Sequence, residues 1–366
     1  MTRRRGTIRR RAKGWYAIAS VTDQAGARHR PRQGPFPTRR DAEAALGQMM
    51  ADLDRGGFVL PNRTPLADYL TTWLDVHRWQ LRPSTANGYE GVVRRYVQPF
   101  IGAVSLKDVR PQHLNDLYAG MVRRGLSPRT VRTVHVVVRR ALSDAVREGL
   151  ITRNVADAAV VPRPKRIEMK TWTAADLRRF LEAVQDDPLY PAMHLAAFTG
   201  MRRGEVCGLR WSDVDLERAR LALSHTVIVV AGSLVEGEPK TERGRRVVDL
   251  DPVTVGVLRT WKAQQAAAQL ATGSRNDRVF QVHPEVLSAV FDRLVRQAGL
   301  PRIRFHDLRH THVSLLAAAG VPPHVISARV GHATVGFTLT HYSHVLPGHQ
   351  ADAAALVARA VLGDVR

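Results

Sequence analysis

The feature that most constrains the fold is a break in sequence periodicity near the middle of the chain. Residues 161–170 (VPRPKRIEMK) are rich in proline and charge and have no regular spacing of apolar residues, which is typical of a linker. The chain of 366 residues is also longer than one typical domain of roughly 100 to 200 residues. We therefore expect separate units at 64–161 and 171–366, together with a smaller unit at 1–57.

Residues 64–161 have a helical pattern throughout. Apolar residues recur every three or four positions in segments such as LADYLTTWLDVH and SPRTVRTVHVVVRRALSDAVREGLI. The spacing predicts a compact bundle of about four helices whose other faces are basic. Arginines spread over such faces suit phosphate contacts better than the reading of bases. The candidates for DNA contact are Arg94, Arg95, Arg129, Arg132, Arg139 and Arg140.

Residues 1–57 have the pattern of a small unit with strands and one helix. WYAIASV alternates as a strand does, ARHRPR fits a returning strand, and TRRDAEAALGQMMADLDRGG fits a helix with a capping pair at Thr38 and Asp41. Seven of the first thirteen residues are basic and none is acidic. We favour a basic module that grips DNA over the alternative, a disordered tail with a packing hairpin.

The charge of the chain indicates a polyanionic partner. The formal net charge is +22, which leaves nucleic acid and an anionic membrane surface as the two candidates. An apolar span of about 18 residues is absent from the sequence, and the basic start lacks the apolar stretch of a signal peptide. A single cysteine, Cys207, fits a reducing compartment. We therefore expect a cytoplasmic protein that binds nucleic acid and no membrane.

Residues 171–366 combine helices with one region that favours strands. The segment opens with a capping pair at Thr173 and Asp176, and residues 216–251 are rich in Val, Ile and Thr with turn residues between the runs. Helical spacing resumes afterwards. The predicted fold class is mainly α with small β-sheets, in a multidomain chain whose third unit is mixed α/β.

Two clusters in this third unit combine arginine with acidic or imidazole groups. In TGMRRGEVCGLRW, Thr199 and Gly200 resemble a helix end, which places Arg202 at a turn with Glu205 three residues later. In RFHDLRHTHVSLLAAAG, His306 shares a helical face with Arg309 and with His310. The usual helical zinc site needs a glutamate after the first histidine, and a guanidinium would repel the cation, so we expect neither metal nor cofactor. Arginine beside imidazole suits a phosphate.

The third cluster, RVGHATVGFTLTHYSHV, contains His332 and, ten residues later, Tyr342. By itself Tyr342 fits an ordinary packing residue. The order of the clusters along the chain changes this interpretation, because it resembles the signature of the tyrosine recombinase (phage integrase) family. That signature is an arginine, a hairpin lysine, the motif H-x-x-R, a histidine or tryptophan, and a tyrosine, matched here by Arg202, Lys240 in PKTERGRR, His306 with Arg309, His332 and Tyr342.

The resemblance implies that the chain cleaves DNA without metal or ATP. Tyr342 would be the nucleophile that forms a 3′-phosphotyrosyl bond, and Arg202 and Arg309 would contact the non-bridging oxygens. His306 would assist proton transfer or support the phosphate, His332 would donate a hydrogen bond, and Lys240 would protonate the leaving 5′ oxygen. Glu205 is expected to orient a cation. We expect phosphate contacts from Arg243, Arg245 and Arg246, and packing or DNA contacts from His310, His341 and His344.

The resemblance also implies partners and a biological task. The chain would act on double-stranded DNA attachment sites as a homotetramer, with DNA-bending accessory proteins or an excision factor, as the integrase of a mobile element or prophage. Residues 64–161 would be the core-DNA-binding domain and 1–57 an arm-type domain. The apolar stripe in 349–363 either folds back on its own domain or docks on a neighbouring subunit. The alternatives are a type IB topoisomerase and a non-catalytic DNA-binding protein on the same fold.

Overall fold

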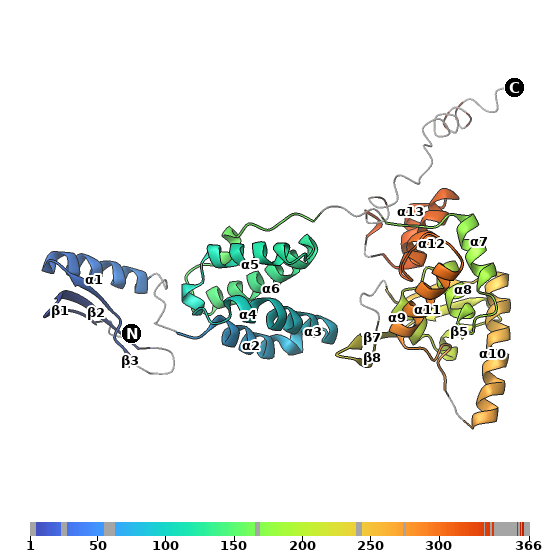
Figure 1. Cartoon of the computed structure of the whole chain (residues 1–366), viewed down its shortest axis with the longest axis horizontal. Coiled ribbons are helices and arrows are strands. Elements are labelled where there is room, and N and C mark those ends of the chain that lie inside the picture. Colours follow the sequence, from blue (N-terminus) through green and yellow to red (C-terminus); the bar gives the residue numbers. More distant parts are fainter. Residues whose placement is uncertain are drawn as a thin grey trace. The chain divides into compact units, whose positions relative to one another are not determined.

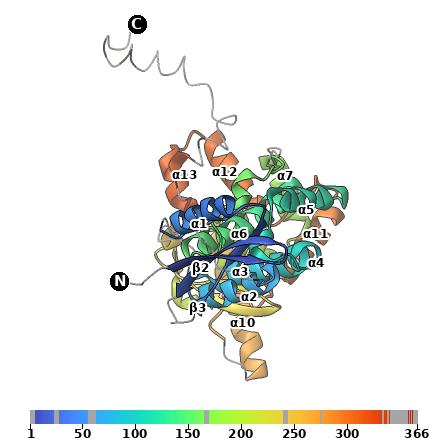
Figure 2. The ribbon, with the colours of Figure 1, turned by 90° about the vertical axis from the view of Figure 1, so that its left-hand side faces the viewer.

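The computed structural model describes residues 5–22, 28–54, 63–164, 169–238, 244–273, 276–332, 334–336, 339, 357, 359 and 361. The chain divides into two compact units, Met1–Arg166 and Ile167–Arg366. Figures 1 and 2 show the helices and strands of these units, coloured along the sequence. The described elements are mainly helices, with small antiparallel sheets, which confirms the predicted fold class. No described helix combines the length and the apolar character needed to cross a bilayer. The finer division into three domains stays a prediction.

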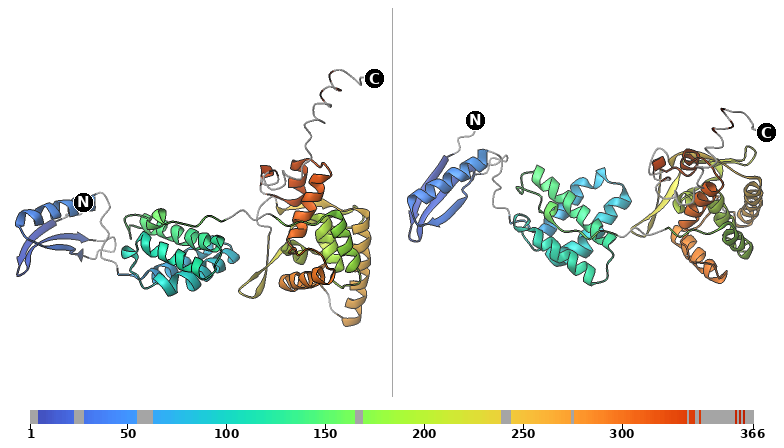
Figure 3. Two further views of the ribbon diagram at one scale, coloured as in Figure 1. Left: turned by 45° about the horizontal axis from the view of Figure 1, so that its top comes forward. Right: turned by 90° about the horizontal axis from the view of Figure 1, so that it is seen from above.

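The first unit begins with a small sheet that carries one helix on one face (Figure 3). Its strands are antiparallel, and they and the helix are β1 (Arg5–Arg11), β2 (Gly14–Thr22), β3 (Arg28–His29), β4 (Arg32–Phe36) and α1 (Arg39–Asp54). Ala17, Ala19 and Met49 are buried between sheet and helix. The Thr38 hydroxyl accepts a hydrogen bond from the Asp41 amide at 3.2 Å, which confirms the predicted cap.

The rest of the first unit is a bundle of helices with its own apolar core. Its helices are α2 (Leu66–His77), α3 (Pro83–Val92), α4 (Gln98–Ile101), α5 (Pro111–Arg123) and α6 (Pro128–Arg147). A π-helical segment, Val93–Val97, lies between α3 and α4. Pro99 explains the widening, because its ring and missing amide hydrogen prevent a regular turn with the carbonyl of Arg95.

The second unit consists of helices around a three-stranded sheet and a separate hairpin. The strands β5 (Val214–Asp215), β6 (Arg220–Leu223) and β9 (Arg246–Asp249) are antiparallel in this order, and β7 (Thr226–Val230) pairs with β8 (Ser233–Gly237). The helices are α7 (Ala174–Ala183), α8 (Tyr190–Thr199), α9 (Arg203–Gly208), α10 (Pro252–Thr272), α11 (Pro284–Gln297), α12 (Asp307–Ala318) and α13 (Pro323–Val330). The predicted small sheet is confirmed.

Helix α8 lies in the interior of the second unit, which determines where the following residues are held. Most of its side chains are buried, whereas most other helices of this unit bury one face. The helix ends at Gly200, whose φ of +65° is left-handed. A Cβ on Gly200 would lie 2.8 Å from the His312 ring, so glycine satisfies both the backbone conformation and the packing. The residues after Gly200 therefore begin at a buried turn.

Candidate active site

Arg202 is placed by the turn that follows α8. It is the N-cap residue of α9, and its backbone amide donates a hydrogen bond of 2.8 Å to the Glu205 carboxylate. The Arg202 guanidinium also donates to Glu205 through Nη1 at 2.7 Å. Arg202 therefore lies at a turn and its guanidinium is bound by Glu205. That Glu205 orients an active-site cation stays a prediction.

Arg246, at the start of β9, is the second cation bound to Glu205. Its Nη1 and Nη2 donate to the carboxylate at 3.2 and 3.1 Å. The Glu205 and Arg246 side chains are 3% and 6% exposed, whereas the Arg202 side chain is 40% exposed. We expected Arg246 to contact phosphate, and the structure corrects this expectation, because its buried guanidinium is bound to Glu205. Arg202 remains open to a ligand.

The ionisation of Glu205 follows from these neighbours. Burial by itself would raise the pKa of this carboxyl group. The charges and hydrogen bonds of Arg246 and Arg202 outweigh burial and hold the pKa of Glu205 below its ordinary value. Glu205 is therefore a carboxylate that balances two guanidinium groups.

Helix α12 brings a third guanidinium to the turn that carries Arg202. Arg309 is 2% exposed and its Nη1 donates to the carbonyl of Gly200 at 2.8 Å. His306 is the N-cap residue of α12, and its ring lies 5.2 Å from the ring of His310. The predicted shared face of these side chains is present, and it points to the end of α8.

His332 reaches the same place from the end of α13. This helix ends at Gly331 with a left-handed φ of +67°, and Arg202 Nη2 donates to the Gly331 carbonyl at 2.9 Å. Burial, followed by the charges of Arg309 and Arg202, lowers the pKa of His332 to about 3. A neutral imidazole beside two guanidinium groups leaves the site ready to receive an anion.

The pKa values of the other two imidazoles of the site, His306 and His310, are lowered as well. Burial and the neighbouring Arg309 lower the pKa of His306, and burial with the approach of His306 lowers the pKa of His310 to about 4. Within the described ranges, no group of three or more His, Cys, Asp or Glu side chains could hold a metal ion. The cluster consists of cations and neutral imidazoles around the Glu205 carboxylate. A second carboxylate, Asp307, pairs with Arg304 and lies close to His306 and His310.

The structure brings together Arg202, Glu205, His306, Arg309 and His332 from three segments of the chain. Other predicted residues, Lys240, Arg243, His341, Tyr342 and His344, lie outside the described residues. Arg245 is exposed and pairs with Glu238. The six arginines predicted to contact DNA from the helical bundle are all exposed, and Arg139 also pairs with Asp157 at 2.6 Å.

The ion pair of Arg246 with Glu205 was not predicted, although the alternation of side chains in β9 pointed to a buried Arg246. In β9, Arg246 and Val248 are two residues apart and therefore point to one face of the sheet. Val248 is 1% exposed, so this face is the buried one. Strand alternation would have assigned Arg246 to the interior.

Two family models match the chain. The model of the phage integrase family matches residues 170–349, and the model described as the phage integrase N-terminal SAM-like domain matches residues 66–122. The chain belongs to the phage integrase family. It is a tyrosine site-specific recombinase, an enzyme that breaks and rejoins DNA strands.

Related proteins span most of the recombinase. A protein named tyrosine recombinase XerC-like from Caldanaerobacter subterraneus subsp. tengcongensis is 26% identical over 345 residues, with 86% of this chain and 88% of the relative covered. The integrase of Mycobacterium phage L5 is 27% identical over 357 residues, with 90% and 91% covered. Each match covers enough of the chain to include parts of both the helical bundle and the second unit, Ile167–Arg366, which we call the catalytic unit.

Solved structures share the fold of the recombinase. The Tn1549 transposon integrase in complex with a circular intermediate DNA has a TM-score of 0.70 at 22% identity, covering 81% of this chain and 100% of that one. A lambda integrase tetramer bound to a Holliday junction has a TM-score of 0.60 at 17% identity, covering 94% and 95%. At these identities the likeness establishes the fold.

Proposed function

We propose that this recombinase is the integrase of a mobile element or prophage and that it cuts and rejoins attachment sites through a covalent bond to Tyr342. The observation that carries the proposal is the convergence of Arg202, Arg309, His306 and His332 around the end of α8. Glu205 is already neutralised by Arg202 and Arg246. The surplus positive charge fits a phosphodiester, whose non-bridging oxygens need donors.

The reaction conserves the energy of the broken bond. The phenol oxygen of Tyr342 attacks phosphorus, the bond from phosphorus to the 5′ oxygen breaks, and the 3′ end remains attached to the tyrosine. The phenol proton passes to a base, and the 5′ oxygen leaves with a proton from Lys240. A 5′ hydroxyl of another strand then attacks the phosphotyrosyl bond. Rejoining therefore requires no ATP.

The described side chains have distinct parts in this reaction. Arg202 and Arg309 contact the two non-bridging oxygens, and removal of one preorganised donor of this kind costs about 2.7 to 4 kcal/mol of transition-state stabilisation. Burial and Arg309 lower the pKa of His306 and so keep its ring neutral, and a neutral imidazole can accept the proton of the nucleophile. His332 donates a hydrogen bond to a phosphate oxygen. Glu205 holds Arg202 in place.

Assembly on DNA follows from the same proposal. The partners are double-stranded attachment sites, a homotetramer on paired sites, and DNA-bending proteins or an excision factor. Exposed arginines of the helical bundle contact phosphates, and residues 1–57 bind accessory DNA sites. The solved complexes support this arrangement, since they include a lambda integrase tetramer on a Holliday junction.

The test is covalent capture on DNA. The substrate is a nicked duplex built from the junction at which the element carrying this gene joins its host chromosome, so that the cleaved strand cannot rejoin. We expect a complex that survives denaturation for the wild type and none for Tyr342→Phe, which lacks the nucleophilic oxygen. Tyr190→Phe, which removes another tyrosine hydroxyl of the same unit, should retain the complex. A covalent complex with Tyr342→Phe would show that another residue attacks.

A further inference from the structure

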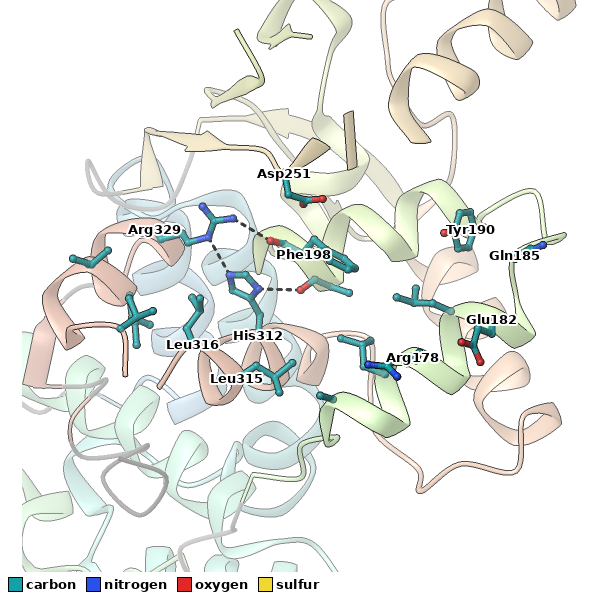
Figure 4. A pocket seen from close by; sticks show the side chains of 17 residues that line it. Arg178, Glu182, Gln185, Tyr190, Phe198, Asp251, His312, Leu315, Leu316 and Arg329 are labelled. Atoms are coloured by element: carbon teal, nitrogen blue, oxygen red, sulfur yellow. Dashed lines mark hydrogen bonds between the residues drawn. The ribbon is translucent and has the colours of Figure 1, made fainter. Parts of the chain in front are cut away.

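The end of α13 is tied to the rest of the catalytic unit by Arg329 and His312 (Figure 4). Arg329 donates through Nε to His312 Nε2 at 3.2 Å, and through Nη1 and Nη2 to the carbonyls of Asp249 and Phe198, both at 3.1 Å. Since His312 Nε2 accepts a hydrogen bond, its Nδ1 carries the proton and donates to the carbonyl of Ala197 at 3.0 Å. The pair therefore joins α12 and α13 to the last turn of α8 and to β9.

Packing does not explain why a guanidinium occupies this position. Arg329 is half-buried, and burial lowers its pKa while the charges of Asp249 and Asp251 act in the opposite direction. It also borders an open cleft of about 720 Å³ whose other walls include Leu177, Leu315 and Val325. Because the Arg329 side chain borders this open cleft, filling space in the core is not its main role. The hydrogen bonds of Arg329 are the feature that a smaller apolar residue could not replace.

These bonds end at the backbone that carries the active site. Helix ends leave carbonyls without partners, and Arg329 and His312 supply donors to two carbonyls in the last turn of α8, ahead of Arg202. From the other side, Arg246 Nε donates to the carbonyl of Arg329 at 2.7 Å. The end of α13 is thus held by Arg246 and by Arg329 itself.

Arg329 and His312 each lie close in sequence to a side chain proposed to contact the phosphate. His312 lies three residues after Arg309 on α12, about one turn away. Arg329 lies three residues before His332, across the glycine that ends α13. Any rotation or shift of α13 relative to α8 would therefore move His332 away from Arg202.

We propose that Arg329 and His312 are positioning residues that set the separation of Arg202, Arg309 and His332 without touching DNA themselves. This inference rests on the proposed recombinase chemistry. It predicts a slower rate of strand cleavage when either residue is replaced and no change in DNA affinity. Neither residue is among the side chains proposed to contact the phosphate. A misplacement of about 1 Å in a catalytic site can slow the reaction about 100-fold.

The experiment compares variants of the full chain on the nicked junction duplex described above. Arg329→Met and His312→Phe should form the covalent complex about 100-fold more slowly at saturating DNA, with unchanged affinity for the duplex. Arg178→Met removes another arginine that lines the same cleft, but its side chain is exposed, so the cleavage rate should stay at the wild-type value. His312→Gln should restore most of the rate lost in His312→Phe, because an amide can accept from Arg329 and donate to Ala197.

A second measurement separates positioning from general stability. Hydrogen exchange of a peptide covering 323–332 should accelerate in Arg329→Met, while a peptide covering α7 should not change. Wild-type cleavage rates in Arg329→Met and His312→Phe, or a His312→Gln variant as slow as His312→Phe, would overturn the proposal. If the wild type formed no covalent complex, the proposed recombinase chemistry would be wrong. Unchanged hydrogen exchange of 323–332 in Arg329→Met would separately show that Arg329 does not hold the end of α13.

Discussion

The helical bundle and the catalytic unit place their charges in opposite ways. Among the described residues of the bundle, Asp144 is the one buried side chain that carries a charge, and it is bound by the Trp73 indole at 2.7 Å and by Arg147. The catalytic unit buries Glu205, Asp307 and Arg309 together with several histidines. A surface that attracts DNA keeps its cations in water, whereas a site that acts on one phosphate must hold cations rigidly.

The difference has energetic consequences. Exposed charges are screened by water and salt, so each contributes little to folding and acts mainly through long-range attraction. A buried charge depends on its partner, because an unpaired charge in the interior is costly. We therefore expect substitutions in the catalytic unit to affect folding and rate together, and substitutions on the bundle surface to affect only binding.

The strongest test of the comparison is Glu205→Gln. The substitution keeps the shape but leaves Arg202 and Arg246 without their carboxylate, and loss of one partner of a buried pair costs about 3 to 5 kcal/mol of unfolding free energy. Glu217→Gln is the matched control, since Glu217 is 86% exposed in its pair with Arg259 and its loss should cost less than about 1 kcal/mol. Urea unfolding of both variants measures this difference. Equal losses would contradict the comparison.

A loss of stability is also expected in acid. The pKa of His310 is about 4 and that of His332 about 3, both below the ordinary 6.5. The unfolded chain therefore binds more protons as the pH falls below 6.5, and the catalytic unit loses stability until about pH 4. In the bundle, His135 has a pKa lowered by burial, so the effect there should be smaller. Hydrogen exchange at about pH 7.5 and about pH 5, corrected for intrinsic rates, measures the loss of protection in each of the two regions. A greater loss of protection in the bundle than in the catalytic unit would contradict the prediction.

The smallest effect on folding is expected from Arg132→Gln on the bundle surface. Arg132 is exposed, so its loss should change the unfolding free energy by less than about 0.5 kcal/mol. If Arg132 contacts a phosphate, the slope of log affinity against log salt should decrease by about one unit. Titrations of duplex DNA at several salt concentrations measure the slope. An unchanged slope would remove Arg132 from the DNA-binding surface.

Local sequence signals predicted the elements that depend on neighbouring residues. The caps at Thr38 and Thr173 are present because each hydroxyl bonds an amide three residues ahead. The turn before Arg202 is present because Gly200 accepts a left-handed backbone after α8. The family signature also predicted that Arg202, Arg309 and His332 lie in one site.

The sequence alone therefore determined the fold class, the family and most of the residues that gather at the end of α8. Tyr342 as nucleophile and Lys240 as acid stay predictions of that signature. Only the tertiary structure decided that Arg246 is buried against Glu205, 41 residues away, and that Arg329 bonds Phe198, 131 residues away. Local patterns cannot encode such pairs, because a guanidinium has similar preferences in water and in an ion pair until packing of distant segments supplies its partner.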